Sequence, residues 1–141
     1  MQDLIHLHEE HEKLVAIAGR FSEMVAHEVP PPSRELYVLR MEFASALIQH
    51  LKAEDWMLYP QLLVSSDKRV AETARAFSKE MGGLARAFMD YAEQWGAHAI
   101  EGDWKRYQRE TAAILEALTL RIAREERDLY PLIEIPRRAA A

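Results

Sequence analysis

Five ionisable residues stand at positions where the surrounding pattern predicts an apolar side chain. His11, His50, Glu54, Arg121 and Glu125 each fall on a stripe that otherwise carries apolar residues every three or four positions. Burying an ionisable group costs several kcal/mol unless it is paired with an opposite charge or binds a metal ion. These five residues are therefore the candidate functional site.

The first chemistry that this set indicates is metal binding. His50 and Glu54 are four residues apart, so on a helix they lie on one face and can bind the same ion. With His11 they form a set of two histidines and one carboxylate, which leaves open coordination positions on iron(II). Glu125 can add a fourth, oxygen ligand. The predicted metal ligands are His11, His50, Glu54 and Glu125, and no separate catalytic residues are predicted.

Arg121 argues against a metal ion. A guanidinium stays protonated in proteins and cannot be a ligand. One helical turn before Glu125, Arg121 can pair with the carboxylates of Glu54 and Glu125 and supply part of the charge that an ion would supply. Two interpretations therefore stay open: one bound metal ion, or a metal-free site closed by these ion pairs.

The elements that must position these residues are four long helices. Gly and Pro cluster at breaks around 30–32, 82–83 and 102, and apolar residues recur at alternating steps of three and four between the predicted ends. Such spacing is typical of antiparallel helices packed in a bundle. We predict an all-α, up-down-up-down antiparallel four-helix bundle, with residues 1–141 as a single domain. The expected helices are roughly 3–28, 33–63, 67–98 and 103–134, with Met57 and Asp128 among the inward positions.

The helical rise predicts that the polar residues share one layer of the bundle. His11 lies roughly 12 Å from the start of its helix, and His50 and Glu54 lie about 14–20 Å before the end of theirs. In antiparallel helices those two ends are neighbours. The same arithmetic brings Met81, Arg121 and Glu125 to a similar depth.

The two halves of the sequence repeat each other around these residues. Glu54 is followed by Leu58-Tyr59-Pro60, and Glu125 is followed at the same spacing by Leu129-Tyr130-Pro131. The repeat pairs His11 with Met81, His50 with Arg121 and Glu54 with Glu125. Each Tyr-Pro pair is expected to end its helix.

These motifs give the chain a resemblance to the hemerythrin-like (HHE cation-binding) domains. The first half carries Glu10-His11 and His50-x-x-x-Glu54, and the second carries Arg121-x-x-x-Glu125. The resemblance implies a bundle that holds a non-haem di-iron centre, with histidines from all four helices and two bridging carboxylates. Family roles include oxygen carriage, iron or oxygen sensing, nitric oxide response and repair of iron centres.

Carried over residue by residue, the resemblance implies a degenerate site. His11, His50, Glu54 and Glu125 match ligand positions, whereas Met81 and Arg121 stand where the third and fourth helices usually supply histidines. An intact di-iron centre is therefore not expected. The expected cofactor is one Fe, Zn or Mn ion, or none. His8, one turn before His11, is a candidate to contact one of the ligand side chains without binding the ion itself.

The composition excludes several classes of binding partner and of chemistry. The chain has 141 residues, no cysteine and a formal net charge of -5, which excludes thiolate chemistry and argues against nucleic-acid binding. No apolar run is long enough for a membrane span, and no secretion signal is recognisable, so a cytoplasmic location is expected. Trp56, Trp95 and Trp104 belong either to the core or to a homodimer interface.

The expected function follows from the site. We expect a non-enzymatic, hemerythrin-like protein that binds one metal ion, or that senses iron, oxygen or nitric oxide. The alternative is a metal-free four-helix-bundle interaction module in which Arg121 closes the former site. A haem-binding bundle with Met81 and a histidine as axial ligands is a third hypothesis.

Overall fold

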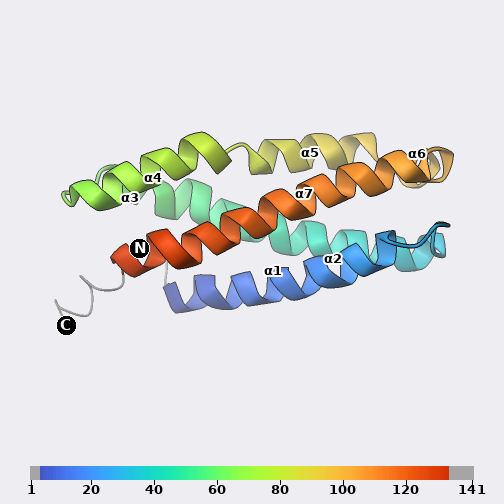
Figure 1. Ribbon diagram of the computed structural model, residues 1–141, viewed down its shortest axis with the longest axis horizontal. Helices are drawn as coiled ribbons and strands as arrows, with labels where there is room; N and C mark the ends of the chain where they lie inside the picture. Colours follow the sequence, from blue (N-terminus) through green and yellow to red (C-terminus); the bar gives the residue numbers. More distant parts are fainter. Residues whose placement is uncertain (1–3, 134–141) are drawn as a thin grey trace.

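The computed structural model describes residues 4–133, and Figure 1 shows an elongated bundle of helices lying side by side. The chain runs along one long helical segment and returns along the next (Figure 1). No strand occurs between residues 4 and 133. The all-α prediction is confirmed. The helices are α1 (Leu4–Val25), α2 (Ser33–Lys52), η1 (Ala53–Leu58), α3 (Tyr59–Leu63), α4 (Lys68–Met81), α5 (Leu84–Gln94), α6 (Ala97–Gly102), α7 (Trp104–Arg124) and η2 (Glu125–Leu129).

The helix boundaries differ from the sequence prediction in three places. The first helix ends at Val25 rather than near 28, and the third predicted helix is interrupted at Gly82–Gly83 and ends at Gln94. The short helix α6 follows as a separate element. The predicted end residues 3 and 134 lie outside the described residues.

Two π-helical turns, η1 and η2, occupy equivalent places in the two halves. Each wider turn rotates the following residues, so the buried positions become Leu58 and Leu129. The expected inward positions Met57 and Asp128 are wrong, because both side chains are exposed. A π turn inside a helix is frequently associated with a functional site.

The Tyr-Pro pairs do not end the helices. Helical structure continues through Pro60 and Pro131 to Leu63 and Ile133. Proline lacks the N–H for an α-helical bond, and its ring clashes with the carbonyl four residues earlier. The widened turn before each proline relieves that clash, so the expectation of a helix end is wrong at both sites.

The apolar core consists of two clusters on either side of a polar layer. One cluster contains Leu14, Leu51 and Leu118, and the other contains Leu7, Leu58 and Leu129. Five buried polar residues lie where the two clusters meet: His11, His50, Glu54, Arg121 and Glu125. The bundle therefore places all five predicted site residues at the boundary between its two apolar clusters.

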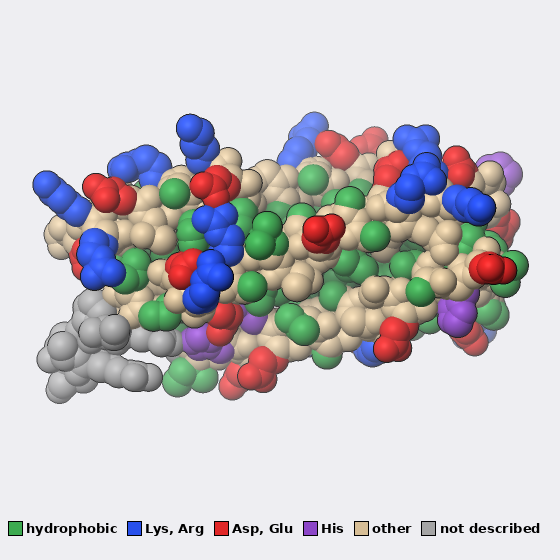
Figure 2. All heavy atoms as spheres, in the orientation of Figure 1, with side chains coloured by type: hydrophobic (Ala, Val, Ile, Leu, Met, Phe, Trp, Pro, Cys, Tyr) green, Lys and Arg blue, Asp and Glu red, His purple; other side chains and the backbone are tan. Residues whose placement is uncertain are grey.

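The surface is mixed in charge. Figure 2 shows basic and acidic side chains interspersed on one face, with histidines reaching the surface beside acidic residues toward the end where α1 begins. Trp95 and Trp104 belong to the core, whereas Trp56 is 71% exposed and lies beside Lys52. None of the described helices combines the length and the apolar character needed to cross a membrane.

Candidate metal centre

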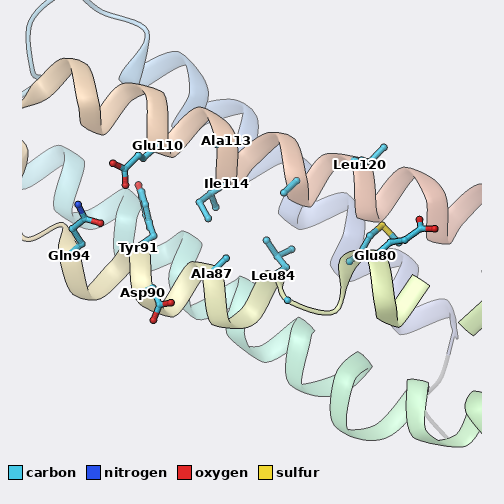
Figure 3. Close-up of a pocket in the computed structure, with 13 residues that line it drawn as sticks. Glu80, Leu84, Ala87, Asp90, Tyr91, Gln94, Glu110, Ala113, Ile114 and Leu120 are labelled. Carbon is cyan, nitrogen blue, oxygen red and sulfur yellow. The ribbon is translucent and has the colours of Figure 1, made fainter. Parts of the chain in front are cut away.

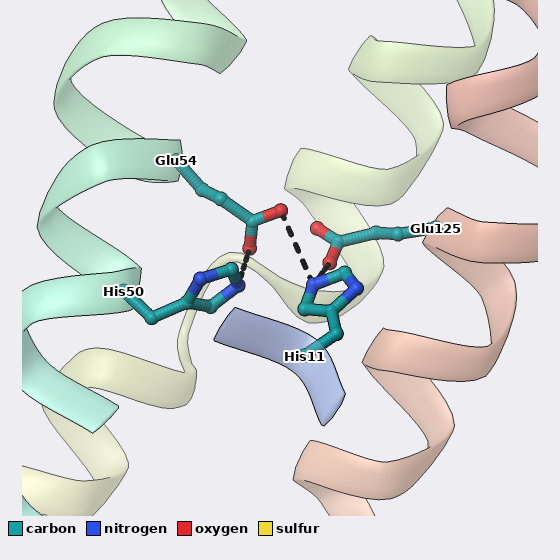
Figure 4. Close-up of side chains that lie close together, drawn as sticks. All are labelled: His11, His50, Glu54 and Glu125. Atoms are coloured by element: carbon teal, nitrogen blue, oxygen red, sulfur yellow. Dashed lines mark ion pairs between the residues drawn. The ribbon is translucent and has the colours of Figure 1, made fainter. Parts of the chain in front are cut away.

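The four predicted ligands converge in the core (Figure 4). His11 comes from α1, His50 from α2, Glu54 from η1 and Glu125 from η2. Each offers one donor atom, and these atoms all lie within 4.8 Å of one another. The four residues are at most 2% exposed. The sequence-based selection therefore names residues that the fold brings together.

The distances between donor atoms suit a single ion. His50 Nε2 lies 2.9 Å from Glu54 Oε1, and His11 Nε2 lies 3.2 Å from Glu125 Oε1 and 3.7 Å from Glu54 Oε2. Two ligand atoms bound to one ion at about 2.1 Å are themselves roughly 3–3.5 Å apart. The whole donor set spans up to 4.8 Å, so some donors would have to move closer to surround one ion.

Two buried polar atoms of this cluster lack a hydrogen-bond partner. They are His50 Nε2 and Glu125 Oε1, and both belong to the donor set. His50 Nε2 approaches Glu54 Oε1 without forming a hydrogen bond. Glu125 Oε1 likewise lies 3.2 Å from His11 Nε2 without a hydrogen bond. An ion among the four donors would satisfy both atoms, so the residues present fit a metal.

Outer carboxylates orient both histidines. His11 Nδ1 donates to Glu126 at 2.7 Å, and His50 Nδ1 donates to Glu10 at 2.6 Å. These contacts turn the Nε2 atom of each ring toward the cluster, an arrangement that metal-bound histidines almost always have. Sequence reasoning missed both carboxylates, although Glu10 directly precedes His11 and Glu126 directly follows Glu125.

A more exposed histidine contacts each outer carboxylate. His8 Nδ1 lies 2.7 Å from Glu126, and His6 Nε2 lies 3.0 Å from Glu10. His8 therefore contacts the carboxylate that holds His11 rather than a predicted ligand. A hollow of about 470 Å³ lies outside the His8–Glu126 pair and is also lined by His11 and Glu12.

Arg121 lies on the side of the centre supplied by the second half of the chain. Its Nη2 donates to Glu54 Oε1 at 3.2 Å and to Asp55 at 2.6 Å, and its Nε donates to Glu125 Oε2 at 3.2 Å. Burial alone would lower the pKa of Arg121, but the carboxylates of Glu54, Glu125 and Asp55 raise it. The guanidinium is therefore a permanent positive charge between the two site glutamates.

The break between α4 and α5 lies beside the polar layer and contributes a backbone group to it. Arg121 Nη1 donates to the backbone carbonyl of Met81, the last residue of α4, at 3.3 Å. Met81 thus reaches the site through its carbonyl group. Gly82 and Gly83 follow at the break and let the chain turn into α5.

Gly82 and Gly83 should respond differently to alanine. A Cβ at Gly82 would lie 2.3 Å from the carbonyl oxygen of Ser78, whereas a Cβ at Gly83 would have no neighbour within 4 Å. We expect Gly82→Ala to lower the free energy of unfolding by about 1–3 kcal/mol. Gly83→Ala should be neutral or stabilising by up to about 1 kcal/mol. Urea unfolding of both variants measures the difference, and equal effects would contradict this account of the break.

Protonation balances the charge of the cluster when no ion is bound. Burial disfavours the charged imidazole, but the hydrogen bonds and charges of Glu125 and Glu54 outweigh it and raise the pKa of His11 to about 10. The pKa of His50 is raised for a similar reason, chiefly by Glu54 against the effect of burial. Burial, and then the negative charge of Glu54, raise the pKa of Glu125 to about 7.

Metal affinity should consequently rise with pH. Near neutral pH His11 holds a proton, because its pKa is about 10, and an incoming ion has to displace it. Each displaced proton adds about tenfold in affinity per pH unit, and His50 can contribute a second. Competition against a chromogenic chelator at two pH values one unit apart measures the slope. An affinity independent of pH across the neutral range would contradict the protonated cluster.

A groove between α5 and α7 is a separate feature (Figure 3). It has a volume of about 560 Å³, with Leu84 and Tyr91 of α5 opposite Ile114 of α7. None of the four donor residues lines it, and it reaches the layer of the centre only at Met81. The groove therefore adds no ligand to the candidate metal centre.

Comparison with known proteins agrees with the geometry. A family model described as the hemerythrin HHE cation binding domain matches residues 3–133. No curated protein and no solved structure matches the chain.

Proposed function

This chain belongs to the hemerythrin HHE cation-binding domain family, and from that premise we propose that it binds one divalent metal ion between His11, His50, Glu54 and Glu125. The observation that carries the proposal is the convergence of four buried residues, each with a donor atom within 4.8 Å of the others. Two of the buried atoms in this cluster, His50 Nε2 and Glu125 Oε1, make no hydrogen bond. Two imidazoles and two carboxylates suit Fe, Zn or Mn.

The proposal is for one ion, because the residues for a second are missing. The repeat places Met81 and Arg121 where the second half would supply histidines. The guanidinium of Arg121 lies 3.2 Å from a carboxylate oxygen of Glu54 and 3.2 Å from one of Glu125. A second cation at this place would meet a fixed positive charge and find no imidazole.

Each residue then has a defined task at the centre. His11 and His50 bind the ion through Nε2, while Glu126 and Glu10 hold their rings in orientation. Glu54 and Glu125 supply oxygen ligands whose charges a divalent ion balances, and Arg121 also pairs with Asp55. Iron(II) in such a set would supply redox chemistry and open positions for a small ligand such as oxygen or nitric oxide. We propose sensing of iron or of such a ligand as the role of the centre.

Metal content is the direct test. Protein purified without chelator, and protein loaded anaerobically with iron(II), should each contain close to one metal ion per chain by elemental analysis. His50→Ala should lose the ion, because it removes a donor from the buried set. His98→Ala is the matched control, since His98 is an exposed histidine on α6 and should leave the content unchanged. An unmodified chain that takes up no metal under either condition contradicts the proposal.

The second candidate function is a metal-free interaction module. One observation favours it: Arg121 contacts both site carboxylates and already supplies a positive charge at the centre. In that case the unmodified chain takes up no metal, and Arg121→His creates metal affinity. The cytoplasmic location, the single domain over residues 1–141 and a homodimer stay predictions.

A further inference from the structure

The two Tyr-Pro motifs of the repeat reach across the bundle to the candidate centre. Tyr59 follows Glu54 in the first half, but its hydroxyl donates to Glu125 Oε2 at 2.7 Å. Tyr130 follows Glu125 in the second half, but its hydroxyl donates to Glu54 Oε2 at 2.5 Å. Each half of the chain therefore supplies the tyrosine that holds the other half's glutamate.

These hydroxyls distinguish the two oxygens of each carboxylate. The Oε2 atoms of Glu54 and Glu125 accept from the tyrosines, whereas the Oε1 atoms lie 2.9 Å from His50 Nε2 and 3.2 Å from His11 Nε2. Glu125 Oε1 has no hydrogen-bond partner. One oxygen of each carboxylate is thus held by a phenol, and the other lies beside a histidine nitrogen of the donor set. Arg121 also donates to one oxygen of each, Glu54 Oε1 and Glu125 Oε2, both at 3.2 Å.

Both phenols are rigid and remain donors. Tyr130 is fully buried and its ring stacks on that of His11, with the two planes 4° apart. Tyr59 is 5% exposed, and the guanidinium of Arg121 lies over its ring. Burial, and then the charges of Glu54 and Glu125, raise the pKa of each hydroxyl above its usual value. Burial and these ring contacts therefore restrict where each hydroxyl points.

We propose that Tyr59 and Tyr130 are positioning residues that restrict Glu125 and Glu54 to coordination through one oxygen each. The inference rests on the proposed metal site and deepens it. A carboxylate that binds through both oxygens occupies two coordination positions on one ion. With each glutamate limited to one, the four residues fill four positions, and the remaining positions stay available to a small ligand.

Infrared spectroscopy of the full chain tests this directly. The antisymmetric and symmetric stretching bands of a carboxylate are farther apart when it binds through one oxygen than when it binds through two. The readout is the difference spectrum between Zn²⁺-loaded and metal-free protein. We expect the wide separation in the unmodified chain and a narrowed separation for one glutamate in Tyr59→Phe and in Tyr130→Phe.

Tyr91→Phe is the matched control. It also removes a buried tyrosine hydroxyl, which lies 2.6 Å from Thr111 Oγ1. Tyr91 belongs to the apolar cluster that contains Leu14, Leu51 and Leu118. Its replacement should leave the band separation unchanged. A merely structural role of Tyr59 and Tyr130 would lower the melting temperature without moving the bands.

The outcomes separate the two proposals. Zn²⁺ uptake with unchanged bands in both site variants overturns this inference alone, as does an equal shift in Tyr91→Phe. No Zn²⁺ uptake by the unmodified chain overturns the proposed metal site, and this inference with it. If one site variant fails to fold, the other decides, because each tyrosine holds a different glutamate.

Discussion

We expect a variant that carries Met81→His and Arg121→His together to bind two metal ions per chain, against the one proposed for the unmodified protein. The repeat pairs these positions with His11 and His50. The substitutions therefore add two imidazoles and remove the guanidinium that lies between Glu54 and Glu125. Replacing a permanent cation by a neutral imidazole also leaves the carboxylates of the layer with charge for a second ion.

The stoichiometry is measured by elemental analysis after equilibrium dialysis against excess Zn²⁺. Met89→His with Arg124→His is the matched control, because it makes the same exchanges at an exposed methionine and at an arginine that pairs with Glu80. The control should still bind one ion. A site variant that also stays at one would mean that the second half of the bundle cannot complete a centre.

Arg121→Met will strongly destabilise the protein when no ion is bound. Arg121 is 2% exposed and contacts Glu54, Asp55 and Glu125, so its removal leaves buried carboxylates without their cation. Breaking a buried ion pair on one side typically costs about 3–5 kcal/mol. In a domain of this size, that corresponds to a fall in melting temperature of roughly 10–20 °C.

Metal should reverse much of that loss, since a bound ion supplies positive charge to the same carboxylates. Arg124→Met is the control: Arg124 is on the same helix and pairs with the exposed Glu80, a contact worth at most about 1 kcal/mol. Thermal unfolding with and without Zn²⁺ compares the four cases. Equal stability of the two variants would show that the Arg121 ion pairs contribute nothing net.

The sequence was sufficient to predict which four residues meet in the core, for a physical reason. The four are ionisable residues on otherwise apolar stripes: His11, His50, Glu54 and Glu125. An apolar stripe with helical spacing predicts which side chains are buried. Burial of charge requires a partner, so these residues had to meet each other or an ion. The same reasoning identified Arg121 as the partner of both glutamates.

The remaining details depend on geometry that residue spacing does not contain. A π turn adds one residue to a helical turn, so Met57 and Asp128, expected inside, are exposed, and Leu58 and Leu129 are buried instead. The displaced register also carries Tyr59 and Tyr130 to the centre. Glu10 and Glu126 are half-buried, and among many surface acids nothing in their spacing marked them as partners of the histidines.

The division of the apolar core by a polar layer bears on how the protein unfolds. Regions with separate apolar clusters can open separately, at free energies below that of global unfolding. An ion held by residues of α1, α2, η1 and η2 contributes its binding free energy only while all four segments are in place. Opening of either end would then have to release the ion. Amide protons in both clusters should therefore become protected together, and the loaded bundle should lose its structure as one cooperative unit.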